Sequence, residues 1–156
     1  MYENSQIPSH TLLNDLLTLY QKKQFAEAEK LAILLTQKYP KHQFAWKVLG
    51  AVFSQTGRSE MAVEANQKAL NLSPKDPESL NNLGNTLREI GKLEEAISSY
   101  KKAIAIKPSH AEAHYNLGNA LNDLGKLDEA ISSYKKAISF KANYLHAYNN
   151  LGFVHK

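Results

Sequence analysis

Residues 77–110 read PESLNNLGNTLREIGKLEEAISSYKKAIAIKPSH, and residues 111–144 read AEAHYNLGNALNDLGKLDEAISSYKKAISFKANY. The two segments are identical at 20 of 34 aligned positions. The same step of 34 residues extends in both directions, as shown by the glycine series Gly50, Gly84, Gly118 and Gly152. Self-similarity at a fixed period of this length is typical of architectures in which small structural units stack side by side.

Apolar residues within each unit recur at steps of three and four, as on one face of a helix. In residues 77–110 they form two groups: Leu80, Leu83, Leu87 and Ile90, then Leu93, Ala96, Ile97, Tyr100, Ala103 and Ile104. Gly91 separates the groups, and glycine favours the left-handed conformation that ends many helices. Pro108 follows the second group and disfavours further helix. The spacing therefore predicts two amphipathic helices per unit, with apolar faces that only neighbouring units can bury.

Composition limits the class of protein. The chain has 156 residues, 43% of them hydrophobic and 22% charged, which is typical of a folded domain. It contains no cysteine, so disulfides and thiolate metal sites are excluded. No apolar run approaches the ~20 residues of a membrane-spanning helix, and the first residues do not resemble a signal peptide. A cytoplasmic protein without membrane association is expected.

Trp46, Leu49, Gly50 and Phe53, followed by Ala62, Ala69 and Pro74, resemble the pattern of the tetratricopeptide repeat family. The resemblance implies an all-α fold, a right-handed superhelical solenoid of stacked antiparallel helix pairs. The expected domain is 9–156, after a disordered tail at 1–8. Its expected repeats are 9–42, 43–76, 77–110, 111–144 and a partial repeat at 145–156.

The first and fourth repeats depart from the pattern. Leu16 stands where the family has glycine, and Asp15 where it has leucine. The first repeat is therefore expected to act as an atypical N-terminal cap. Ala142 replaces the proline that ends the second helix in the other repeats.

The resemblance also implies a concave groove lined by the first helix of each repeat. The side chains expected to bind a peptide there are Lys47, Asn81, Asn82, Asn85, Arg88, Glu112, Tyr115, Asn116, Asn119, Asn149, Asn150 and Phe153.

Asparagine dominates this set. Asn82, Asn116 and Asn150 are 34 residues apart, and Asn85 and Asn119 form a parallel row. A primary amide both donates and accepts hydrogen bonds, so it can pair with the C=O and N–H of an extended peptide. The row is similar to the asparagine ladder of O-linked N-acetylglucosamine transferases and of kinesin light chains. Alternatively, these asparagines brace neighbouring repeats or face water.

The charge of the expected groove indicates the kind of peptide. In the third and fourth repeats one arginine, Arg88, stands against the carboxylates Glu78, Glu89, Glu112 and Asp123. The carboxylate clamp that holds acidic chaperone tails is absent: Lys47 fits one of its lysines, but Glu112 and Asn116 stand where it needs the second lysine and the arginine. The expected partner is therefore an extended peptide that is neutral or basic rather than acidic.

Other chemistry is not expected. The lysine pairs, such as Lys101 and Lys102, fall on second helices and suit a solvated face, so nucleic-acid binding is not expected. The histidines lack metal-ligand spacing, and no phosphate-binding loop or nucleophile elbow is present, so no metal, cofactor or catalysis is expected.

These observations predict a non-catalytic scaffold that binds an extended segment of a partner protein. The alternative is the N-terminal targeting region of a larger repeat-containing glycosyltransferase or sulfotransferase. The apolar residues of the last helix, Tyr148, Leu151 and Val154, also suggest self-association.

Overall fold

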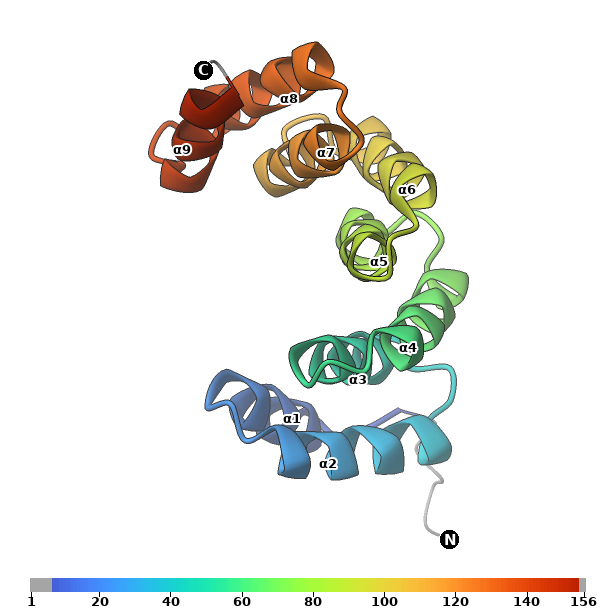
Figure 1. Ribbon diagram of the computed structural model, residues 1–156. Coiled ribbons are helices and arrows are strands. Elements are labelled where there is room, and N and C mark those ends of the chain that lie inside the picture. The colour runs from blue at the N-terminus through green and yellow to red at the C-terminus, as the bar shows by residue number, and fades with distance from the viewer. Residues whose placement is uncertain (1–6, 155–156) are drawn as a thin grey trace, which may run out of the picture. The chain divides into compact units, whose positions relative to one another are not determined.

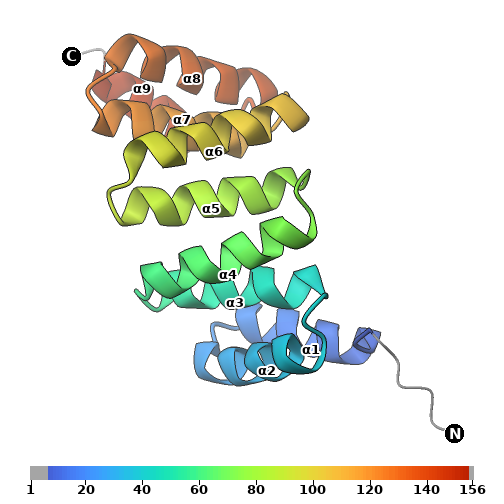
Figure 2. The same ribbon diagram turned by 90° about the vertical axis from the view of Figure 1, so that its right-hand side faces the viewer.

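The computed structural model describes residues 7–154, and every regular element in that range is an α-helix (Figures 1 and 2). The all-α prediction is confirmed. Residues 1–6, most of the segment predicted to be a disordered tail, lie outside the described residues. The helices group into two compact units, residues 1–74 and 75–156.

The first unit contains two helix pairs. Its helices are α1 (His10–Gln21), α2 (Phe25–Lys38), α3 (Gln43–Gln55) and α4 (Ser59–Leu72). Helix α3 packs against both α2 and α4, and α1 contacts α2 and α3. The second unit contains two further pairs and a single last helix: α5 (Pro77–Glu89), α6 (Leu93–Ile106), α7 (Ala111–Asp123), α8 (Leu127–Phe140) and α9 (Leu145–Val154).

Glycine ends the first helix of three pairs. Gly57, Gly91 and Gly125 have φ angles of 75°, 79° and 77°, in the left-handed region that side chains with a Cβ disfavour. After α5, the N–H of Lys92 bonds back to the carbonyl of Leu87 at 2.9 Å, which satisfies one of the free carbonyls at the helix end. The prediction of glycine stop signals is confirmed.

The second helices end without needing proline. Helix α6 ends at Ile106, before Pro108, as predicted, and α8 ends at the equivalent Phe140 although Ala142 replaces the proline. In both turns the first N–H beyond the helix still bonds to an alanine carbonyl four residues earlier, Ala103 or Ala137. The position of the stop is thus set by the packing and the turn, with proline only reinforcing it.

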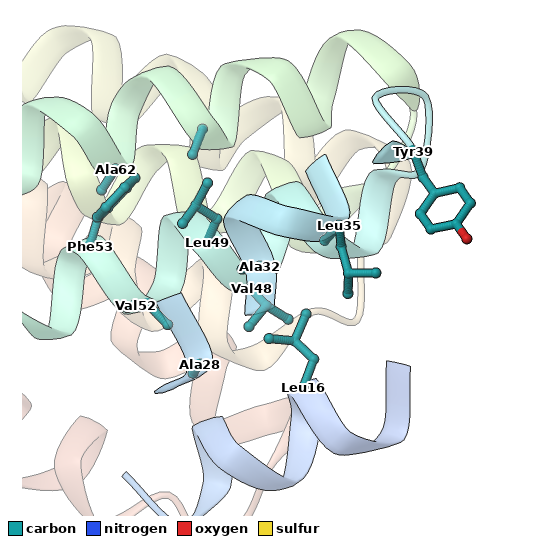
Figure 3. Packing of buried hydrophobic residues seen from close by; sticks show 12 residues of the cluster. Leu16, Ala28, Ala32, Leu35, Tyr39, Val48, Leu49, Val52, Phe53 and Ala62 are labelled. Atoms are coloured by element: carbon teal, nitrogen blue, oxygen red, sulfur yellow. The ribbon is translucent and has the colours of Figure 1, made fainter. Parts of the chain in front are cut away.

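In the first helix pair, the small residue lies on the second helix and the large one on the first, the reverse of the later pairs. Leu16 stands at the glycine position and is fully buried, while the residue at the aromatic position of the second helix is Ala32, also fully buried. Both belong to the buried cluster of the first unit, which is shown in Figure 3. A large residue on the first helix and a small one on the second therefore fill the same core that a small and a large residue fill in later pairs.

Candidate functional site

The expected binding residues are divided between the two units. Lys47 lies on α3 in the first unit, where it is half-buried. The other expected residues all lie in the second unit. We call their shared face the first-helix surface, defined by Asn81, Asn82, Asn85 and Arg88 on α5, Glu112, Tyr115, Asn116 and Asn119 on α7, and Asn149, Asn150 and Phe153 on α9.

Asn81 connects α5 to α7. Its Nδ2 donates to Glu112 Oε1 at 3.2 Å, and its Oδ1 accepts from Asn116 Nδ2 at 3.1 Å. The side chain is only 1% exposed, so within the first-helix surface it lies beneath the other side chains and does not face solvent. Asn81 therefore acts as the brace that the alternative interpretation described, and it orients Glu112 and Asn116 above it.

A second network connects α7, α8 and α9. Asn119 Oδ1 accepts from Tyr134 Oη at 2.9 Å and from Asn150 Nδ2 at 2.8 Å. The same Nδ2 of Asn150 also donates to Tyr115 Oη at 3.3 Å. Both N–H groups of Asn150 are thus used inside the protein, and these bonds fix the orientation of its amide.

The contact between Tyr134 and Asn119 has a counterpart one repeat earlier. Tyr100 Oη donates to Asn85 Oδ1 at 2.8 Å. Burial raises the pKa of both tyrosines, so their hydroxyls remain protonated and able to donate at neutral pH. Tyr100 was predicted only as part of the apolar face of its helix, and the contact of either tyrosine hydroxyl with an asparagine was not predicted.

Several amide groups on the surface keep unused hydrogen-bonding capacity. Asn82 is half-buried and Asn149 is exposed, and the side chain of neither has a partner among residues 7–154. Asn116 and Asn150 use their Nδ2 atoms, but their Oδ1 atoms have no partner within the same range. These groups are available to an added ligand.

The charges of the surface are only partly compensated. Arg88 Nε lies 2.6 Å from Asp123 Oδ2, so this pair across α5 and α7 is neutral as a whole. Glu78 lies 3.8 Å from Lys107 Nζ and 3.3 Å from His110 Nε2. Glu112 is exposed and accepts only the neutral amide of Asn81. Glu112 is therefore the carboxylate that most directly gives this surface a negative charge.

An open pocket of about 530 Å³ lies at the end of the surface nearest α9. It brings together four of the expected residues, Arg88, Asn119, Asn150 and Phe153. Its other lining residues are Asn122, Asp123, Leu127, Tyr134 and Val154. Phe153 is 73% exposed, so an apolar wall and several amides meet in one place.

Aromatic rings gather around Tyr115. Its ring centroid lies 4.9 Å from that of Tyr144, 6.0 Å from Tyr134 and 6.4 Å from His146. Burial, and more weakly the charge of Glu112, raises the pKa of Tyr144 to about 12. Tyr144 was missed by the sequence analysis because it precedes the last helix, at the position of Asp76 and His110 in earlier repeats.

Of the helices between residues 7 and 154, none combines the length and the apolar character needed to span a bilayer. The same residues include no group of three histidine or acidic side chains placed to hold a metal ion.

Models of the tetratricopeptide repeat match most of the chain. One matches residues 84–125 and 118–156, a second residues 65–98 and a third residues 45–76. Together they extend over 45–156, which confirms that the chain contains tetratricopeptide repeats. No curated protein matches the chain in sequence.

Solved structures of similar fold include the crystal structure of MamA, with a TM-score of 0.80 and 27% identity over 88% of this chain and 81% of that one. PilF of Pseudomonas aeruginosa has a TM-score of 0.85 and 21% identity, over 92% of this chain and 66% of PilF. The first repeat domain of Spaghetti (RPAP3), bound to the HSP90 peptide SRMEEVD, has a TM-score of 0.70 and 24% identity, over 72% of this chain and 90% of that one.

Proposed function

Because the chain belongs to the tetratricopeptide repeat family, we propose that it is a non-catalytic scaffold for protein interactions. Its ligand is an extended segment of a partner protein, held on the first-helix surface of the second unit. The observation that carries the proposal is the set of oriented amides on α5, α7 and α9 with unused donors and acceptors. Peptide backbones present the complementary groups at regular intervals.

The complex of RPAP3 with an HSP90 peptide supports peptides as the class of ligand. That peptide, SRMEEVD, carries several acidic residues. In this chain the single arginine of the surface, Arg88, is already paired with Asp123, and Glu112 is exposed. We therefore propose that the preferred peptide here is neutral or basic, because an acidic one would meet an uncompensated carboxylate.

The pocket beside α9 supports a specific anchor in the ligand. Phe153, Leu127 and Val154 provide apolar contact, and Asn150 and Asn119 lie beside them. An extended peptide that crosses the amides can place one apolar side chain in this pocket. Interfaces commonly obtain much of their binding energy from a few such buried anchors.

Selection from a random-sequence peptide library, with the whole chain as bait, tests the proposal. The variant Asn82→Ala with Asn149→Ala removes two amides that brace nothing, so the fold should persist. Each lost hydrogen bond should cost about 1 kcal/mol, or roughly a five-fold rise in Kd. Asn143→Ala, in the exposed turn before α9, is the matched control and should bind normally. Equal affinity of the double variant and the wild type, with circular dichroism unchanged, would refute the proposal.

A second candidate interaction is self-association through α9. Tyr148 is 49% exposed. Gly152 lies one turn later on the same face, and a Cβ placed on it would have no neighbouring atom within 4 Å. We propose that two copies pair their α9 helices antiparallel, with Tyr148 of each over Gly152 of the other. The chain already makes this kind of contact internally, between Tyr134 and Gly118.

Light scattering over a range of concentrations tests the self-association. The wild type should form dimers as concentration rises, and Tyr148→Glu should remain monomeric because a charge would be buried in the pair. Lys101→Glu, an exposed change on α6, is the control and should still form dimers. A wild type that stays monomeric at all concentrations contradicts the pairing.

A further inference from the structure

The hydroxyls of Tyr100 and Tyr134 reach from the second helices to the first-helix surface. Each ring lies over the glycine of its own repeat, Gly84 or Gly118, and both rings are buried. Because glycine has no side chain, the ring can pass close to the first helix and bring Oη to the next residue along. There it donates to Asn85 or Asn119, at 2.8 and 2.9 Å.

An amide whose oxygen is held from one side presents its nitrogen on the other. Asn85 and Asn119 both use Oδ1 to accept from a tyrosine, and neither Nδ2 has a partner in residues 7–154. Each therefore offers N–H donors away from the tyrosine. Asn119 lines the open pocket, so an added ligand can approach this region.

The neighbouring row has the opposite polarity. Asn116 donates through Nδ2 to Asn81, and Asn150 donates through Nδ2 to Asn119 and Tyr115. Their nitrogens are directed into the protein, so their Oδ1 atoms remain as free acceptors. Two rows with opposite hydrogen-bonding character thus lie side by side, one on α5 and α7 and the other on α7 and α9.

From this arrangement we propose that Tyr100 and Tyr134 are positioning residues, which turn Asn85 and Asn119 into a donor row beside the acceptor row of Asn116 and Asn150. This inference rests on the proposed function. The ligand that fits is the edge of an extended polypeptide, whose carbonyls meet the donor row and whose N–H groups meet the acceptor row. The protein then recognises the backbone of the ligand, and a ligand side chain in the pocket adds a preference for certain sequences.

The sequence of the first unit agrees with the pairing of tyrosine and asparagine. One repeat before Tyr100 and Asn85 the residues are Asn66 and Ala51, and two repeats before they are Ala32 and Leu17. The groove asparagine is present only in the repeats that also have the tyrosine. A phenylalanine ring would fill the same space over the glycine, so the tyrosine hydroxyl has a role apart from packing. Burial raises the pKa of both tyrosines, so this hydroxyl stays protonated and can donate.

The first test needs no ligand. In the free wild type, 15N relaxation should show the side-chain amides of Asn85 and Asn119 to be rigid, with order parameters near those of the backbone. Tyr100→Phe should make the Asn85 amide mobile while leaving Asn119 rigid. Tyr134→Phe should leave Asn85 rigid and loosen Asn119 by less, because Asn150 Nδ2 still donates to the Asn119 oxygen. Each variant is thus the control for the other. Unchanged rigidity in both variants would overturn the positioning role, whether or not a peptide binds.

The second test uses a neutral peptide from the random library. Tyr134→Phe should raise its Kd about three- to ten-fold, the usual range for one hydrogen bond, with helicity unchanged. Asn119→Asp keeps the oxygen that accepts from Tyr134 but removes the donor, and should weaken binding similarly.

Combining the two changes distinguishes positioning from general loosening. If Tyr134 acts through the Asn119 donor, the double variant should bind no worse than Asn119→Asp alone. Fully additive losses, or no effect of Tyr134→Phe, would overturn the inference. Failure of every library peptide to bind the wild type would instead count against the proposed function, and the relaxation result would still decide the positioning role.

Discussion

Tyr134 lies so close over Gly118 that a Cβ on the glycine would be 2.6 Å from Tyr134 Cε1. Gly84 and Tyr100 repeat the relationship at 2.5 Å. The close approach explains the glycine at these two positions, because any larger residue would push the second helix away. It also brings the tyrosine hydroxyl within reach of the first-helix surface.

Gly118→Ala should lower the free energy of unfolding by about 1–3 kcal/mol, as overpacked cores do, despite the better helix propensity of alanine. Denaturant unfolding followed by circular dichroism measures it. Gly152→Ala, at the same repeat position with no atom near the added Cβ, is the control and should be neutral or slightly stabilising in dilute solution. A loss of equal size at both sites would contradict the steric explanation.

Lys23 takes the position that glycine holds in later repeats. Its φ is 58°, close to the 75° of Gly57, so a side chain stands where the backbone is left-handed. Lys23→Gly should therefore raise the free energy of unfolding by about 0.5–1 kcal/mol, since the relief of strain exceeds the entropy cost of glycine. Lys22→Gly removes the same charge at a φ of −78° and should not stabilise. If Lys22→Gly stabilised the protein as much as Lys23→Gly, the lost charge and not the backbone strain would be the cause.

Glu29 and Arg58 join α2 to the start of α4 through two hydrogen bonds of 2.6 and 2.8 Å. The hydrogen bond to Arg58 holds the pKa of Glu29 below its ordinary value of 4.5. A lowered folded-state pKa means that the pair stabilises the fold above the unfolded-state pKa and loses this effect as pH falls through the folded-state value.

The stability advantage of the wild type over Glu29→Gln should thus be largest near neutral pH and should shrink below the ordinary pKa of 4.5. Chemical unfolding of both proteins across that range measures the difference. Glu64→Gln, on the exposed side of α4, is the control and should follow the wild type at every pH. A constant difference between the wild type and Glu29→Gln would contradict the assignment.

Glu112 should set the charge preference of the first-helix surface. Glu112→Gln keeps an oxygen that can accept from Asn81 but removes the negative charge, so basic peptides should bind several-fold more weakly and with less dependence on salt. Neutral peptides should be unaffected. The exposed Glu94→Gln on α6 controls for net charge, and an equal effect from that variant would mean that only the overall charge matters.

The repeats, the helices and the glycine stops could be predicted because they depend on period and local conformation. Which of two adjacent asparagines is buried and which faces solvent could not be predicted in the same way. Asn81 and Asn82 are adjacent in sequence, yet the first is buried as a brace and the second keeps a free amide. The direction of each amide depends on its hydrogen-bond partners, which come from another helix and in most cases from another repeat.

The first helix pair shows another limit. A leucine at the glycine position suggested altered packing, but only the structure shows that Ala32 at the opposite position makes room for Leu16. Such compensation depends on which residues of the two helices face each other, and this is known only once the helices are packed. The role of Tyr144 beside Tyr115 is similar, because the residue belongs to the turn between α8 and α9, and its position in space follows from the packing of these two helices.

Side-chain amide spectra recorded during titration with a library-selected peptide test the central claim most directly. The account predicts that the resonances of Asn82, Asn85, Asn116, Asn119, Asn149 and Asn150 shift together and saturate with the measured Kd. Shifts confined to second helices or to the first unit, with these amides unchanged, would contradict it.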